Sequence, residues 1–181
     1  MTDILALDIA SKLGWARGHV GDAAPTCGSV RFGSDGASHD AIYGAAGTWM
    51  IELLMQEPRP DIVAIEALLP PHVIRKRSNQ EHDLLPGLHG VIRMVLFLKG
   101  VYRPQLVPVQ TWRNHFIDLS VVARGEAKLH VLRKCRSLGW LECADDDAAD
   151  ACGLWSYACA CIDPVTALQV SPLFMRRRAT A

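Results

Sequence analysis

The 181-residue sequence has no apolar run long enough to cross a lipid bilayer, which needs roughly 20 consecutive apolar residues. Its longest candidate, residues 91–98, is interrupted by Arg93 and followed by Lys99. The first residues, Met1-Thr2-Asp3, lack the basic start and the cleavage site of a signal peptide. These absences argue against a membrane protein and predict a cytoplasmic one.

The six cysteines contain no pair of C-x-x-C motifs, so the pattern of a zinc ribbon is missing. Cys159 and Cys161, one residue apart, have a spacing that would allow metal binding. Most of the cysteines have apolar neighbours, and we therefore expect them to pack as small hydrophobic side chains.

Neither sign of charge predominates, because 19 Lys and Arg residues face 19 Asp and Glu residues. The charges are nevertheless clustered. Arg75-Lys76-Arg77 and Arg176-Arg177-Arg178 are basic, and Asp145-Asp146-Asp147 is acidic. A neutral sum of this kind is compatible with a basic binding face beside an acidic site.

Apolar patterns predict alternating strands and helices, without internal repeats. Continuous apolar runs indicate strands buried on both faces, and apolar residues at helical spacing indicate amphipathic helices. The predicted strands are residues 4–8, 14–20, 26–32, 61–66 and 105–109. The predicted helices are residues 37–56, 81–99, 111–117, 126–138 and from 146 or 147 to about 162.

This order predicts an α/β fold with a mixed five-stranded sheet. The first three strands are separated by short turns and form an antiparallel meander, and the later strands alternate with helices. Helices then cover both faces of the sheet. We predict one domain over residues 1–165 and a basic C-terminal tail over residues 166–181.

Acidic residues follow this pattern at three places. Asp8 ends the first predicted strand, Glu66 ends the fourth, and Asp147 and Asp150 open the last long helix. The i, i+3 spacing puts Asp147 and Asp150 on one helical face. If the first and fourth strands are parallel neighbours, all four carboxylates meet at one edge of the sheet.

Four carboxylates at short range repel one another unless a cation lies between them. Hard oxygen ligands favour Mg²⁺ or Mn²⁺. Two such ions can activate water and stabilise the leaving oxygen in phosphodiester hydrolysis. Acidic residues at a helix start also act as caps, which is the structural interpretation of Asp145 and Asp146.

Three short motifs resemble the acidic motifs of RuvC-type Holliday junction resolvases: Ile4-Leu5-Ala6-Leu7-Asp8-Ile9-Ala10, Ala64-Ile65-Glu66 and Asp147-Ala148-Ala149-Asp150-Ala151. Three further stretches are similar to phage and prophage members: Val109-Gln110-Thr111-Trp112-Arg113, Gly125-Glu126-Ala127-Lys128 and Leu138-Gly139-Trp140. The resemblance extends over roughly residues 3 to 160.

The resemblance implies an RNase H-like fold, a homodimer and Mg²⁺- or Mn²⁺-dependent nicking of four-way DNA junctions. It implies Asp8, Glu66, Asp147 and Asp150 as catalytic residues and metal ligands. Asp146, four residues before Asp150, is an additional or substitute ligand on this interpretation.

Two further expectations concern DNA and the dimer. The predicted phosphate contacts are Arg75, Lys76, Arg77, Lys128, Lys12 and Arg113. Trp15 and Trp112 either stack on bases or are buried, and burial is the ordinary outcome for tryptophan. Gly87 and Gly90 would let the helix over residues 81–99 approach a second copy closely.

Three alternatives stay open at this point. One is a debranching nuclease for forks and flaps, as phage DNA processing needs. Another is a branched-DNA-binding protein without catalysis. An actin-like or sugar-kinase ATPase also begins with an apolar strand and an aspartate, but it needs a second lobe and a glycine-rich phosphate turn that this sequence lacks.

Overall fold

A five-stranded mixed sheet forms the centre of the fold in the computed structural model, which describes residues 1–56, 58–69, 79–117, 124–140 and 145–169. The strands are β1 (Asp3–Asp8), β2 (Lys12–His19), β3 (Thr26–Arg31), β4 (Ile62–Glu66) and β5 (Gln105–Val107), in the order β3-β2-β1-β4-β5. The first three strands pair antiparallel, whereas β4 is parallel to β1 and β5 is parallel to β4. The predicted meander and mixed sheet are confirmed.

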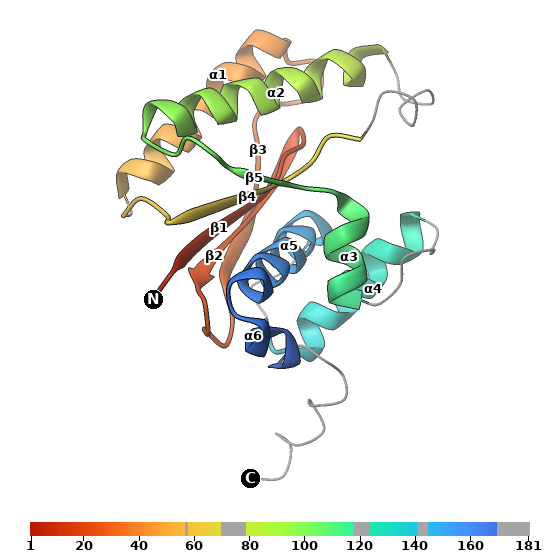
Figure 1. The fold of residues 1–181 in the computed structure, drawn as a ribbon. Helices are drawn as coiled ribbons and strands as arrows, with labels where there is room; N and C mark the ends of the chain where they lie inside the picture. The colour runs from red at the N-terminus through yellow and green to blue at the C-terminus, as the bar shows by residue number, and fades with distance from the viewer. Residues whose placement is uncertain (57, 70–78, 118–123, 141–144, 170–181) are drawn as a thin grey trace.

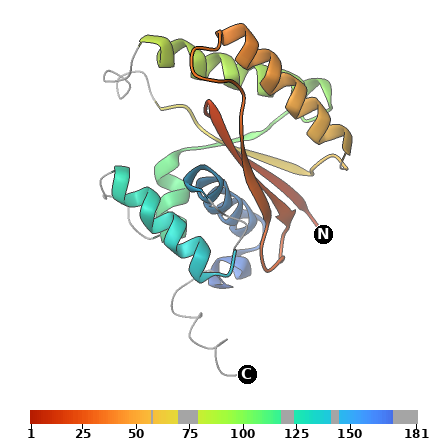
Figure 2. The same cartoon turned by 180° about the vertical axis from the view of Figure 1, so that it is seen from behind.

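Helices cover both faces of this sheet, as Figure 1 shows. They are α1 (His39–Gln56), α2 (Asn79–Leu98), α3 (Val109–Ile117), α4 (Arg124–Ser137), α5 (Asp146–Ile162) and α6 (Pro164–Gln169). The pair α1 and α2 lies on one face, and α3 to α6 lie on the other. The view from behind in Figure 2 shows the same two layers. No helix in the described part of the chain combines the length and the apolar character of a bilayer span.

The two central strands are apolar throughout because each of their faces is covered. Leu5 and Leu7 of β1 pack with α1 and α2, whereas Ile4 and Ala6 pack with α5. All four side chains are fully buried. Each leucine or isoleucine buried in this way stabilises the fold by roughly 1.5–3 kcal/mol. Continuous burial explains why these strands lack the alternation of a half-exposed strand.

Some predicted boundaries were wrong. Strand β5 ends at Val107 and Val109 already belongs to α3, because Pro108 has no backbone N–H for the sheet. Helix α6 was missed, although Asp163 accepts a hydrogen bond from Val165 N (3.0 Å) and Pro164 takes the first helical position. Both are ordinary signals of a helix start. The first four residues of the predicted tail belong to α6, and residues 170–181 lie outside the described residues.

The described cysteines divide by burial. Cys27, Cys135, Cys152 and Cys159 are buried, as expected for small hydrophobic side chains, and Cys161 is exposed. Burial raises the pKa of the Cys159 thiol to about 12, which disfavours the thiolate that binds metals. With one cysteine buried and the other exposed, Cys159 and Cys161 do not face a common site. Cys143 lies outside the described residues.

Candidate active site

Two acidic residues end neighbouring parallel strands. Asp8 is the last residue of β1, and Glu66 is the last residue of β4. The register aligns Leu7 with Ile65, so the next residue on each strand emerges at the same edge of the sheet. The carboxyl ends of parallel strands are a common location for functional sites in α/β proteins.

The first turn of α5 supplies the other acidic residues. Asp145 is the N-cap of this helix, since its Oδ1 accepts a hydrogen bond from Ala148 N at 2.8 Å. The capping interpretation of Asp145 is thereby confirmed. Asp147 and Asp150 follow in the helix, and the Asp150 side chain is only 2% exposed.

Gly14 lets this turn approach the sheet closely. It pairs with Asp8 across β1 and β2, and a Cβ added to it would lie 2.0 Å from the backbone oxygen of Asp147. Only a residue without a side chain leaves room for this contact. Helix α5 therefore starts directly over the strand that neighbours Asp8.

The charges of Asp8, Glu66, Asp147 and Asp150 affect one another. Burial, and then the charges of Glu66, Asp150 and Asp147, raise the pKa of Asp8 well above its usual range, while Lys128 opposes the shift. Burial raises the pKa of Asp150 to about 6; the charge of Glu66 adds to this, and Arg113 opposes it. Residues at the ends of β1 and β4 and in the first turns of α5 therefore lie close enough for their charges to affect one another.

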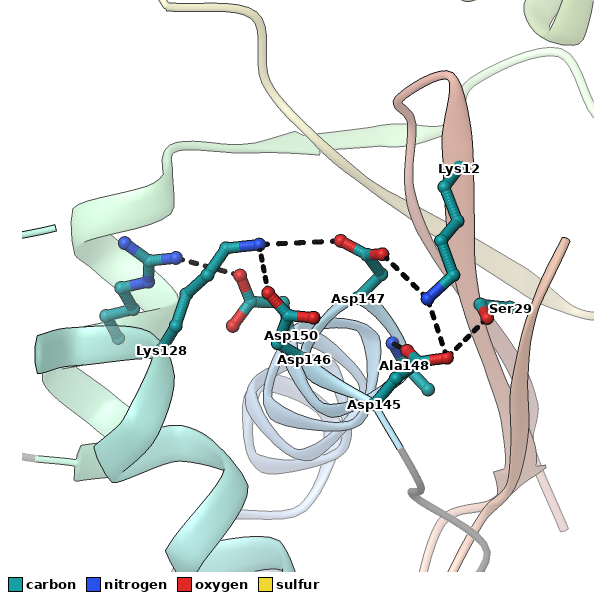
Figure 3. Close-up of polar contacts among 9 residues, drawn as sticks. Lys12, Ser29, Lys128, Asp145, Asp146, Asp147, Ala148 and Asp150 are labelled. Carbon is teal, nitrogen blue, oxygen red and sulfur yellow. Dashed lines mark hydrogen bonds and ion pairs between the residues drawn. The ribbon is translucent and has the colours of Figure 1, made fainter. Parts of the chain in front are cut away.

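Among the described residues, three basic side chains pair with the aspartates at the start of α5, and Figure 3 shows Lys12 and Lys128 on either side of Asp147. Lys12 Nζ lies 2.9 Å from Asp145 Oδ2 and 3.2 Å from Asp147 Oδ2. Lys128 Nζ, on α4, lies 2.7 Å from Asp146 Oδ2 and 3.4 Å from Asp147 Oδ1. Asp147 is thus flanked by two ammonium groups. Arg113 Nη2, on α3, donates to Asp150 Oδ2 at 2.8 Å.

Trp112 has a role at the site that its sequence position does not indicate. The side chain is fully buried, as its tryptophan character suggested, but its Nε1 donates to Glu66 Oε2 at 2.9 Å. Gly153 of α5 leaves room for the Trp112 ring, because a Cβ at this position would lie only 2.7 Å from the ring. Trp112 and Arg113, consecutive on α3, thus each hold one carboxylate of the site. No local sequence signal predicts these pairings, which depend on how α3 packs beside β4 and α5.

The aspartates that precede Asp147 are held by the same lysines. One oxygen from each of Asp145, Asp146 and Asp147 lies within 4.8 Å of the others. Burial would raise the pKa of Asp145, but hydrogen bonds from Ala148 N, Ser29 and Lys12 lower it to about 2. The hydrogen bond from Lys128 lowers the pKa of Asp146.

The predicted DNA-contacting residues divide into two groups. Arg75, Lys76 and Arg77 lie outside the described residues. Lys12, Lys128 and Arg113 surround the carboxylates and are paired with them. Their side chains reach the site from β2, α4 and α3, so its rim is basic and its centre is acidic.

The oxygen donors at the centre suit a hard divalent cation. Among the described residues, Asp150 Oδ1 is buried and has no hydrogen-bond partner. A buried carboxylate oxygen without a partner is costly unless a cation or a proton satisfies it. The residues present therefore fit a bound Mg²⁺ or Mn²⁺ by the chemistry of their donor atoms.

Comparisons with known proteins identify the fold. No family model and no curated protein matches the sequence. RuvC of T. thermophilus in complex with a Holliday junction substrate is similar in structure, with a TM-score of 0.68, 18% identity and coverage of 90% of this chain and 96% of that chain. Another Thermus thermophilus RuvC structure has a TM-score of 0.59 and 17% identity, covering 86% and 94% of the two chains. The chain therefore has the RuvC fold, an RNase H-like mixed sheet with helices on both faces.

Proposed function

We propose that the chain is a divalent-metal-dependent endonuclease that cleaves branched DNA, including four-way junctions. The observation that carries this proposal is the convergence of Asp8, Glu66, Asp147 and Asp150, from three separate elements, at one edge of the sheet. The same edge carries a buried carboxylate oxygen that lacks a partner among the described residues.

In this proposal Asp8, Glu66, Asp147 and Asp150 hold Mg²⁺ or Mn²⁺, and Asp146 is an additional candidate ligand. Bound divalent ions would supply an activated water and charge stabilisation for phosphodiester hydrolysis. Trp112 keeps the Glu66 carboxylate in place through its N–H. Lys128 and Lys12 stand beside Asp147, where an ammonium group can contact a phosphate of the substrate.

The proposed substrate rests on the fold and on the basic rim. One structure with this fold is RuvC with a Holliday junction substrate. Around the acidic centre, Lys12, Lys128 and Arg113 supply positive charge. The basic cluster at residues 75–77 follows β4 in sequence and is proposed to add phosphate contacts. Replacing its three residues by alanine should weaken DNA binding and reduce its dependence on salt concentration.

We further propose that two copies associate through α2. The C-terminal half of α2 exposes large apolar side chains, with Met94 55%, Phe97 59% and Leu98 72% exposed. In the described part of the chain, no neighbouring atom lies within 4 Å of a Cβ added to Gly90, so a second helix can approach there. Gly87 does not serve this purpose, because Tyr43 of α1 fills the space beside it.

The dimer is tested by light scattering coupled to gel filtration. Phe97→Glu should shift the protein towards the monomer, because a charge replaces an apolar contact. Val165→Glu, at a 60% exposed site on α6, is the matched control and should leave the mass unchanged. A monomeric parent protein would overturn this part of the proposal.

The nuclease proposal is tested with labelled four-way, three-way, flap and duplex DNA, each with Mg²⁺ and with Mn²⁺. Asp8→Asn, Glu66→Gln, Asp147→Asn and Asp150→Asn should each abolish cleavage and spare DNA binding. Asp40→Asn, at an exposed acid in the first turn of α1, should cleave as the parent does. Full activity of Asp8→Asn would refute the ligand assignment. Equal cleavage of flaps and four-way junctions would favour a debranching nuclease. DNA binding without cleavage would favour a non-catalytic branched-DNA-binding protein.

A further inference from the structure

One row of residues crosses the sheet beside the candidate active site. Asp8 of β1 is paired with Gly14 of β2, and Gly14 is paired with Ser29 of β3. A carboxylate, a glycine and a hydroxyl therefore lie in line across three adjacent strands. All three lie beside the start of α5.

The start of α5 is attached to this row at two points. The backbone oxygen of Asp147 lies over Gly14, where a Cβ would be 2.0 Å away. Ser29 Oγ donates to Asp145 Oδ2 at 2.6 Å. Lys12, also on β2, adds an ion pair to Asp145 Oδ2 at 2.9 Å (Figure 3). The helix start is thus tied to β2 and β3 while its acidic residues reach towards Asp8.

Asp145 connects these attachments to the helix itself. Its Oδ1 caps α5 through Ala148 N, and its Oδ2 receives Ser29 and Lys12. Both oxygens are therefore committed to protein donors. Coordinating a metal through either one would break the cap or the tie to β3.

We infer that Asp145, with Ser29, is a positioning residue of the candidate active site: it fixes the first turn of α5 on the sheet and so sets the distance from Asp147 and Asp150 to Asp8 and Glu66. This inference rests on the proposed function. Asp145 acts through the neighbouring carboxylates and does not bind the metal. Loss of such a support typically lowers metal affinity 10- to 100-fold.

The test measures Mn²⁺ affinity by calorimetry on the DNA-free protein, well below its melting temperature. Asp145→Ala removes the cap and the tie to β3 and should weaken Mn²⁺ binding by about tenfold or more. Asp145→Asn keeps an oxygen for the cap, and asparagine caps helices as well as aspartate does. Its amide N–H can donate to Ser29 Oγ, so the tie to β3 remains, whereas the ion pair with Lys12 is lost. Its affinity should stay within about threefold of the parent's.

Ser29→Ala tests the tie without changing any carboxylate. It should weaken Mn²⁺ binding by a few-fold, and the double variant with Asp145→Ala should bind no worse than Asp145→Ala alone, since both changes break one interaction. Ser38→Ala is the matched control. Ser38 Oγ accepts from Ala41 N at the start of α1, so its loss also removes a helix cap. That variant should melt earlier and bind Mn²⁺ with unchanged affinity.

Each outcome decides between roles. Unchanged Mn²⁺ affinity in Asp145→Ala would overturn the inference and leave the proposed function intact. Equal loss in Asp145→Asn and Asp145→Ala would show that the negative charge of Asp145 matters and that the cap and the tie to Ser29 do not, which also overturns it. A parent protein that binds no Mn²⁺ would overturn the proposed function first, and the inference with it.

Discussion

Gly14→Ala should damage both stability and cleavage, because it inserts a methyl group where α5 touches the sheet. The added Cβ would lie 2.0 Å from the backbone oxygen and 2.4 Å from the backbone carbon of Asp147, whereas real Cβ contacts are essentially never shorter than 3.0 Å. The helix start must therefore move by about 1 Å away from β2. Both close atoms belong to the backbone, so no side-chain rotation can relieve the overlap.

Overpacking of this kind costs about 1–3 kcal/mol. Alanine regains about 0.5–1 kcal/mol over glycine inside a strand, so the free energy of unfolding should fall by a net amount of up to about 2.5 kcal/mol. The effect on cleavage should be larger, because a displacement of about 1 Å at a catalytic group can cost a factor of about 100 in rate.

The assays are urea unfolding and single-turnover cleavage of a four-way junction with Mg²⁺. Gly44→Ala is the control, since Gly44 lies in α1 with open space around its Cβ position. That variant should gain up to about 1 kcal/mol of stability from helix propensity and should cleave normally. A Gly14→Ala protein as stable and as active as the parent would refute the contact between α5 and β2.

Three more predictions concern other contacts. Trp112→Phe removes the N–H that donates to Glu66, and single-turnover cleavage should fall by about tenfold; parent-like rates would show that Glu66 needs no such support. Burial, with the charge of Arg93, lowers the pKa of His89 from 6.5 to about 4. As the pH falls, the unfolded chain therefore takes up the proton at a higher pH than the folded protein does. The free energy of unfolding, measured in urea, should be constant above pH 6.5 and should decrease by up to about 3 kcal/mol towards pH 4. His89→Gln should flatten this dependence, and an equally steep profile would assign it to other groups. Asp3→Asn should lower the free energy of unfolding by about 2 kcal/mol, because it weakens the pairing of the largely buried Arg17 side chain, whose Nε lies 3.1 Å from Asp3 Oδ2. Asp40→Asn should lower the free energy of unfolding by less than about 0.5 kcal/mol. Equal losses in the two variants would show that the Arg17 pair contributes nothing specific.

The central strands could be predicted from the sequence because their signal is local. Residues 4–7 and 62–65 are apolar in succession, and that pattern follows directly from burial on both faces. Because β1 and β4 run in the same direction, the carboxylates at their C-terminal ends lie at the same edge of the sheet. Asp147 and Asp150 are placed on one face by helical spacing. The acidic centre thus follows from patterns within short stretches, once β1 and β4 are taken as parallel neighbours.

The supports of the site could not be predicted, because they depend on packing between elements. Ser29 meets Asp145 only because β3 and β2 are in one particular register and α5 lies across them. Trp112 meets Glu66 only because Gly153 lets its ring lie against α5. The two glycines of α2 are a further case in which packing could not be predicted from the sequence. Gly87 and Gly90 have the same sequence signature, yet Gly87 packs against Tyr43 within the chain.

The pairing of the basic residues at the site also depends on packing between elements. The sequence predicts Lys12, Lys128 and Arg113 as DNA contacts. In the structure Lys12 and Lys128 both pair with Asp147, and Arg113 pairs with Asp150. A phosphate can take over such a cation only if the carboxylate is neutralised in another way, since an unpaired buried charge is costly. A divalent ion among Asp8, Glu66, Asp147 and Asp150 would provide that neutralisation. Metal binding and DNA binding should therefore assist each other, and by linkage the assistance must be equal in both directions.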